Sequence, residues 1–153
     1  MNDKVKKTLS ALQNQCARRE YCSADILKKA SDRLDGDRDA ALEVLEALKE
    51  EGYVDDSRYA AAFAREKSAI SAWGPAKIRY ALSGKRIDRN IIEQALSQID
   101  ADSADVRMER LLENKFKSLK GDPQAKLKLL KFALGRGYDY DTLRSAVDRI
   151  CQG

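Results

Sequence analysis

The chain has 153 residues and a mass of 17.2 kDa, which is enough for one domain or for a few small repeated units. Charged residues make up 35% of it, but 29 Lys and Arg against 25 Asp and Glu leave a net charge of only +4. Histidine is absent, which removes the commonest general base and the commonest transition-metal ligand from the chain.

Further absences also point away from an enzyme. The sequence has no glycine-rich phosphate-binding loop, and Cys16, Cys22 and Cys151 form no close pair of the kind that binds zinc. We therefore expect no catalytic residue, no cofactor and no metal ion. No apolar run approaches the roughly 20 residues that a membrane span needs, and the start of the chain lacks a signal-peptide core. We expect a cytoplasmic protein that is monomeric.

From the N-terminus onward, three kinds of helix are predicted, and each kind returns three times. Leading helices are expected at about 8–18, 57–72 and 104–119. The middle helices that follow contain Leu27, Ile78 and Leu129 at a spacing of 51 residues. Two of them hold a proline that suits the first turn, Pro75 and Pro123, and a glycine that we expect to end the helix in the left-handed conformation, Gly84 and Gly135.

The last helix of each group has the clearest pattern. Apolar residues recur at helical spacing in DAALEVLEAL, in RNIIEQALSQI and in DTLRSAVDRI, and the three stripes are again 51 residues apart. Asp37, Asp88 and Asp139 precede the stripes with the same spacing, where an aspartate can cap a helix N-terminus. The sequence therefore predicts an all-α fold with three tandem three-helix repeats, at 1–54, 55–101 and 102–153, that form an elongated, curved array.

The stretch GYVDDSRYAAAFAR, residues 52–65, connects the first repeat to the second. Gly52 is expected to end a helix, and Asp55 is expected to cap the next one, with Val54 packed on Tyr59. Asp56 suits the positive end of the helix dipole. Adjacent carboxylates could also hold Mg²⁺, but before a helix they are more often caps. We therefore interpret this stretch as a structural joint.

Charge is distributed unevenly along the chain. Acids concentrate in residues 32–56, and bases concentrate in residues 73–89 and 115–136. These basic segments could face a polyanion, although runs of charge are usually solvated helix faces. Trp73 could stack on a base, but a side chain that fills the junction between two helices is the more common arrangement.

Four segments together resemble the RecX family of bacterial recombinase regulators. They are GYVDDSRYAAAFAR, RREYCSADILKKA with Arg19 and Ser23, WGPAKIRYALSGKRI with Gly74, Ile78, Leu82 and Ile87, and FALGRGYDYDTLRSAV with Arg136, Gly137 and Tyr138. The resemblance spans nearly the whole chain in the family's order. The chain departs from it in the first middle helix, where the small Ala30 replaces the leucine often found before the turn.

The resemblance implies a regulatory protein that is not an enzyme. Members of the family bind the RecA recombinase in the groove of its filament on DNA and restrain its ATPase and strand exchange. The expected partner is thus the RecA filament, with the DNA backbone as a secondary, weaker partner, and such contacts would weaken with salt. Our candidate residues for this surface are Lys77, Arg79, Lys85, Arg86, Arg89, Lys126, Lys128, Lys131 and Arg136.

A stand-alone helix-turn-helix DNA-binding protein is the alternative interpretation. Residues 75–96 contain a helix, a short turn at Gly84 and a capped helix, as helix-turn-helix proteins do. The start of the second helix, however, offers Arg89 and Asn90 and few other side chains that could read base edges.

Overall fold

The computed structural model describes residues 1–152, and this part of the chain forms nine α-helices and no β-strand. The helices follow one another without long loops. Their bounds are α1 (Asp3–Arg18), α2 (Ser23–Arg33), α3 (Arg38–Glu50), α4 (Asp56–Ala69), α5 (Pro75–Gly84), α6 (Arg89–Ser97), α7 (Ala101–Ser118), α8 (Ala125–Gly135) and α9 (Tyr140–Gln152).

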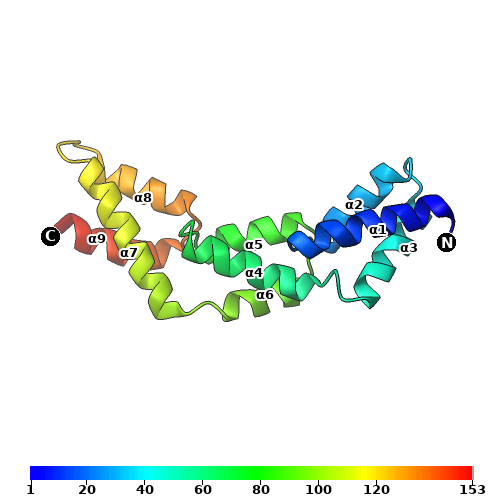
Figure 1. Cartoon of the computed structure of the whole chain (residues 1–153). Helices are drawn as coiled ribbons and strands as arrows, with labels where there is room; N and C mark the ends of the chain where they lie inside the picture. Colours follow the sequence, from blue (N-terminus) through cyan, green and yellow to red (C-terminus); the bar gives the residue numbers. More distant parts are fainter. Residues whose placement is uncertain (153) are drawn as a thin grey trace.

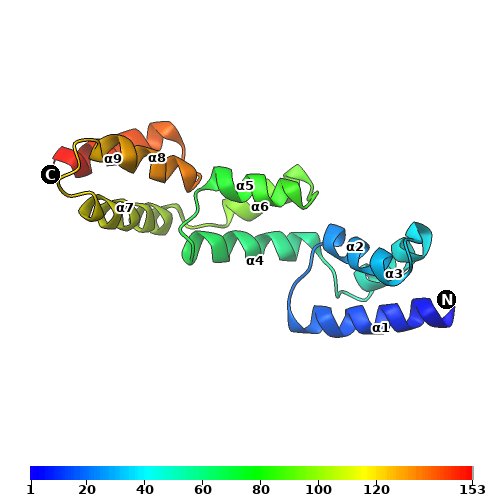
Figure 2. The same ribbon diagram turned by 90° about the horizontal axis from the view of Figure 1, so that it is seen from above.

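The molecule is long and curved, with three groups of helices in a row and the two chain ends at its opposite tips (Figures 1 and 2). The helices α1 to α3 pack on one another, as do α4 to α6 and α7 to α9. The predicted all-α array of three tandem three-helix repeats is confirmed. We call these groups the first, second and third clusters, and the repeat boundaries after residues 54 and 101 stay a prediction.

Each cluster has its own hydrophobic core. The apolar stripes of the last helices supply much of it, for Val44, Leu48, Leu143 and Val147 are almost fully buried. Two residues at the start of α2 reach the second cluster: Cys22 is fully buried in its core, and Ala24 packs against that core. The three cores are therefore separate, and the start of α2 belongs to the second of them.

Most of the predicted caps are present. Asp37 accepts a hydrogen bond from the amide of Ala40, and Asp55 accepts one from the amide of Arg58. Asp88 caps α6 in the same way through the Asn90 amide, while Asp139 accepts a bond from the Thr142 hydroxyl. The predicted packing of Val54 on Tyr59 is wrong, because Val54 lies in the first core and Tyr59 in the second.

Two of the glycine predictions are wrong. Gly84 and Gly135 are the last residues of α5 and α8 and do not have positive φ angles. The left-handed residue comes two positions later, at Arg86 with φ of 59° and Gly137 with φ of 91°. Asp35, with φ of 55°, occupies the equivalent place after α2, so the left-handed turn itself repeats every 51 residues.

The starts of three predicted helices also move. The third leading helix, α7, begins three residues before its predicted start, at Ala101, where Asp100 accepts a bond from the Ser103 amide. Pro123 lies in a turn, and α8 begins two residues later at Ala125, because Asp122 organises that turn by accepting a bond from the Gln124 amide. The first leading helix begins earlier than predicted, at Asp3, where the side chain of Asn2 accepts a bond from the Val5 amide. In each case a nearby side chain that accepts a bond from a backbone amide sets where the helix begins.

Candidate interaction surface

The middle helices α2, α5 and α8 follow one another along the upper side of the molecule in Figure 1. The outward faces of α5 and α8 carry bases and large apolar side chains. On α5 the Tyr80 side chain is 82% exposed beside Arg79, and on α8 Leu127 and Leu134 are exposed on either side of Lys131. This edge could therefore form both charged and apolar contacts with a partner.

In the second cluster, three of the predicted basic residues already have partners within the chain. Arg79 binds both carboxylate oxygens of Glu93, with its Nε 2.6 Å and its terminal nitrogen 3.2 Å away. The Lys85 ammonium lies 2.9 Å from Asp25, and the Lys77 ammonium lies 4.5 Å from the centre of the Trp73 ring. Trp73 is half-buried against the second core, which agrees with a side chain that fills a junction.

Arg86 and Arg89 differ from these three residues. Both are exposed, and neither side chain makes an ion pair or a hydrogen bond within residues 1–152. Arg86 lies in the turn that connects α5 to α6, and Arg89 is the first residue of α6. Their full charge is therefore available to an anionic partner.

The predicted residues of the third cluster divide in the same way. Lys126 pairs with Asp148 at 2.7 Å, and Lys128 pairs with Asp122 at 2.5 Å. Arg136 is half-buried and donates to the Ser71 carbonyl at 2.9 Å, so it connects two clusters. Lys131 is exposed and has no ion pair among the described residues.

The ion pairs shift the pKa values of their members in opposite directions. The hydrogen bond from Arg79 raises the pKa of that guanidinium and lowers the pKa of the Glu93 carboxyl. Likewise, the hydrogen bond between Lys126 and Asp148 raises the pKa of the lysine and lowers the pKa of the aspartate. These pairs are exposed, so water and salt screen them, and either base can exchange its partner for another anion.

The first joint, between the first and second clusters, is made by polar contacts around Cys22. The Asp56 carboxylate accepts a hydrogen bond from the Ser23 amide at 2.8 Å and thereby caps α2 from the start of α4. Arg58 forms an ion pair with Glu20 and donates to the carbonyl of Gly52. Sequence reasoning assigned Asp56 only to its own helix, because a contact 33 residues away leaves no local signal.

The second joint, between the second and third clusters, is made by backbone. The amides of Gly74 and Ala76, at the start of α5, donate to the carbonyls of Arg136 and Gly137, at 2.7 and 3.0 Å. A Cβ atom on Gly74 would lie 2.4 Å from the Gly137 oxygen. The N-terminal amides of α5 are thus satisfied by carbonyls that follow α8. The Tyr138 hydroxyl adds a bond to the Ala72 carbonyl at 2.6 Å.

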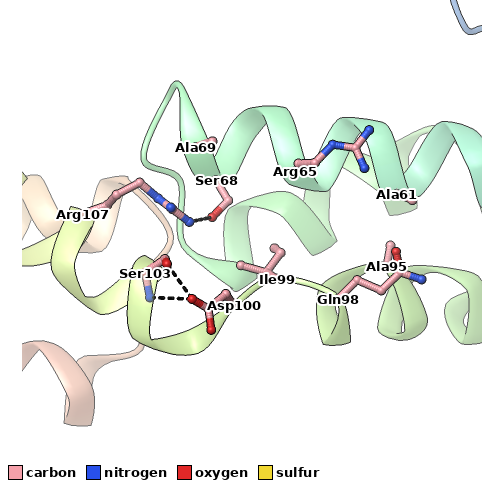
Figure 3. A pocket seen from close by; sticks show the side chains of 10 residues that line it. All are labelled: Ala61, Arg65, Ser68, Ala69, Ala95, Gln98, Ile99, Asp100, Ser103 and Arg107. Carbon is pink, nitrogen blue, oxygen red and sulfur yellow. Dashed lines mark hydrogen bonds between the residues drawn. The ribbon is translucent and has the colours of Figure 1, made fainter.

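A small pocket of about 260 Å³ lies beside the contact of α4 with α7 at the second joint (Figure 3). Arg107 reaches from α7 to the buried hydroxyl of Ser68 at 2.9 Å, and Asp100 caps α7 by binding Ser103. Sequence reasoning missed Arg107, although a basic residue on an otherwise apolar helix face was a visible signal. No group of His, Cys, Asp or Glu within residues 1–152 is arranged to hold a metal ion.

None of the nine helices in the described part is long and apolar enough to cross a membrane. Residues 55–96 match the family model described as the second three-helix domain of RecX. The regulatory protein RecX of Chlorobium phaeobacteroides is 34% identical over 136 residues, which cover 86% of this chain and 85% of the relative. That of Pseudomonas entomophila is 32% identical over 129 residues, which cover 83% of this chain and 81% of the relative.

The chain belongs to the RecX family. Not every RecX relative is covered so fully: the matches span 53% of the protein of Clostridium botulinum and 64% of that of Clostridium perfringens. A crystal structure of RecX from Lactobacillus salivarius has the same fold, with a TM-score of 0.81, 22% identity and full coverage of both chains. A second RecX crystal structure gives a TM-score of 0.84 at 22% identity and covers 95% of this chain and 72% of the other.

Proposed function

We propose that this RecX-family chain binds the RecA filament in its groove, as a monomer in the cytoplasm, and restrains the ATPase and strand exchange of the recombinase. Its relatives are regulatory proteins, and no chemistry of an enzyme is needed for this role. DNA is a secondary partner in the proposal, reached through exposed bases. The nine predicted basic residues remain candidates for this contact.

The shape of the molecule is the observation that carries the proposal. Three separate cores stand in a curved row, and the helices of 9 to 18 residues lie within their own clusters (Figure 1). At 1.5 Å per residue, one helix such as α4 is about 21 Å long, so the row of clusters extends well beyond a single helix length. A long curved body of this kind can contact more than one subunit of a helical polymer.

The pairing pattern ranks the candidate bases. Arg86, Arg89 and Lys131 can meet an anion without breaking an existing pair, because each is exposed and unpaired among the described residues. Arg79, Lys85, Lys126 and Lys128 must first give up or share a carboxylate. Lys77 and Arg136 contribute to the second joint, so we expect their loss to affect shape as well as binding.

The proposal is tested with RecA filaments assembled on single-stranded DNA. We expect the chain to bind these filaments far more tightly than the same DNA without RecA, and to lower the ATPase rate. The double substitution of Arg86 and Arg89 to Glu should weaken inhibition by about tenfold or more and reduce its salt dependence, because two potential phosphate contacts become repulsive.

A matched control carries the same change in charge at the far end of the molecule, with Lys6→Glu and Lys7→Glu on the exposed face of α1. This control should inhibit almost normally. Equal affinity of the unchanged chain for naked DNA and for filaments would contradict the proposal and favour the helix-turn-helix alternative. That alternative is weakened by α6, whose exposed face continues from Arg89 and Asn90 to the acidic Glu93.

A further inference from the structure

A second, larger cavity opens at the second joint, and the basic surface does not account for it. It has a volume of about 590 Å³ and is lined by residues of α5, α6, α7 and the turn before α9. Trp73, Ile78, Ile99 and Met108 form much of its wall, so the wall is mainly apolar. A cavity of this size between two structural units, with an apolar wall and few polar groups, is typical of a binding site.

The charged side chains that line this cavity are two acids and one base. Asp105 and Asp139 line it, and the Asp139 carboxylate accepts a hydrogen bond from the Thr142 hydroxyl. The Asp105 carboxylate makes no ion pair or hydrogen bond within residues 1–152. Arg79 is the one basic side chain among its lining residues in the described part of the chain, and Glu93 neutralises it through a two-fold contact. Two further bases lie close by, but Arg107 donates to the hydroxyl of Ser68 and Arg136 donates to the carbonyl of Ser71. The carboxylate of Asp105 is therefore the group at the edge of the cavity that can attract a cation.

We propose that this cavity is a docking site for a protein segment of the filament, which inserts one apolar side chain and places a neighbouring Lys or Arg against Asp105 and Asp139. Charge and shape complementarity select this occupant: a basic residue pairs with the free carboxylate of Asp105, and the apolar residue next to it fills the apolar wall. The inference rests on the proposed function and adds to it a second surface, which contacts protein. DNA would meet Arg86 and Arg89, and protein would meet the second joint.

Access to the cavity depends on groups that can be changed without disturbing a core. Ala104 lines the cavity from α7 with a small side chain, and Asp105 next to it is exposed. Val106, on the same helix, is 51% exposed and does not line the cavity. A larger residue at position 104 therefore fills the cavity, whereas the same residue at position 106 points elsewhere.

The test measures the affinity of four variants for RecA filaments assembled on single-stranded DNA. Ala104→Phe and Asp105→Lys should each bind about tenfold or more weakly than the unchanged chain, as loss of a central contact does. The matched controls Val106→Phe and Glu113→Lys, on the same helix, should bind normally. Thermal unfolding shows whether each variant is folded. If Ala104→Phe does not fold, the test rests on Asp105→Lys, because Asp105 is exposed.

The possible failures are distinguishable. Normal binding by Ala104→Phe and Asp105→Lys would overturn the docking site and leave the proposed function intact. Failure of the unchanged chain to bind filaments would overturn the proposed function and the docking site with it. A small organic molecule retained in the cavity, seen by native mass spectrometry and lost in Ala104→Phe, would assign the cavity to a soluble ligand and also overturn the proposal.

Discussion

At the scale of single residues, the first joint depends on Asp56, whose carboxylate caps α2 although it belongs to α4. Asp56→Ala should lower the free energy of unfolding by about 1 kcal/mol, the usual effect of losing a helix cap. Urea denaturation followed by circular dichroism measures it. Asp39→Ala is a suitable control, because Asp39 lies in the first turn of α3 but accepts no side-chain hydrogen bond in the described part. Equal stability of both variants would show that Asp56 does not stabilise the joint.

Cys22 gives the first joint a dependence on pH. Burial raises the pKa of its thiol from 9.0 to about 11, so the folded chain favours the neutral form. The contribution of this thiol to the free energy of unfolding is fully present below pH 9, the pKa of the thiol in the unfolded chain. It is lost as the pH rises toward 11. We expect Cys22→Ala to flatten this part of the stability profile measured by urea denaturation. An equally steep fall in the variant would assign the loss to other groups.

At the scale of helices, the second joint depends on close approach of α5 to the turn after α8. Gly74→Ala would place a Cβ against the backbone of Gly137, and we expect the joint to open at a cost of about 1–3 kcal/mol. Small-angle X-ray scattering measures the change in the largest dimension of the molecule, and thermal unfolding measures the loss of stability. Unchanged scattering and unchanged stability would contradict this account of the joint.

Gly84→Ala is the control for that substitution. Gly84 ends α5 without a positive φ angle, and an added Cβ would meet nothing within 4 Å. Alanine restricts the unfolded chain more than glycine does, so this variant should be more stable by about 0.4–1 kcal/mol. A destabilised Gly84→Ala variant would instead support the left-handed cap that the sequence predicted.

Capping aspartates and Gly74 show what sequence can predict and what it cannot. Apolar spacing and capping aspartates are local, so the helices, their order and their three-fold repetition were predicted from them. The role of Gly74 was not predictable, because it depends on a carbonyl 62 residues away at Arg136. The basic residues were visible as a surface, but whether Lys85 finds Asp25 is decided by how two clusters pack.

At the scale of the whole molecule, the two joints have different physical characters. Ion pairs and a capping carboxylate connect the first and second clusters, whereas backbone hydrogen bonds and close glycines connect the second and third. Salt screens exposed ion pairs and hardly affects backbone contacts that exclude water. Salt should therefore loosen the first joint more than the second joint, which lies beside the proposed docking site.

The most direct measurement is electron cryomicroscopy of RecA filaments on single-stranded DNA with the chain present. Our account predicts continuous additional density along the filament groove, with a length and curvature that match the row of three clusters in Figures 1 and 2. Density confined to the filament ends, or to bare DNA between filaments, would contradict it.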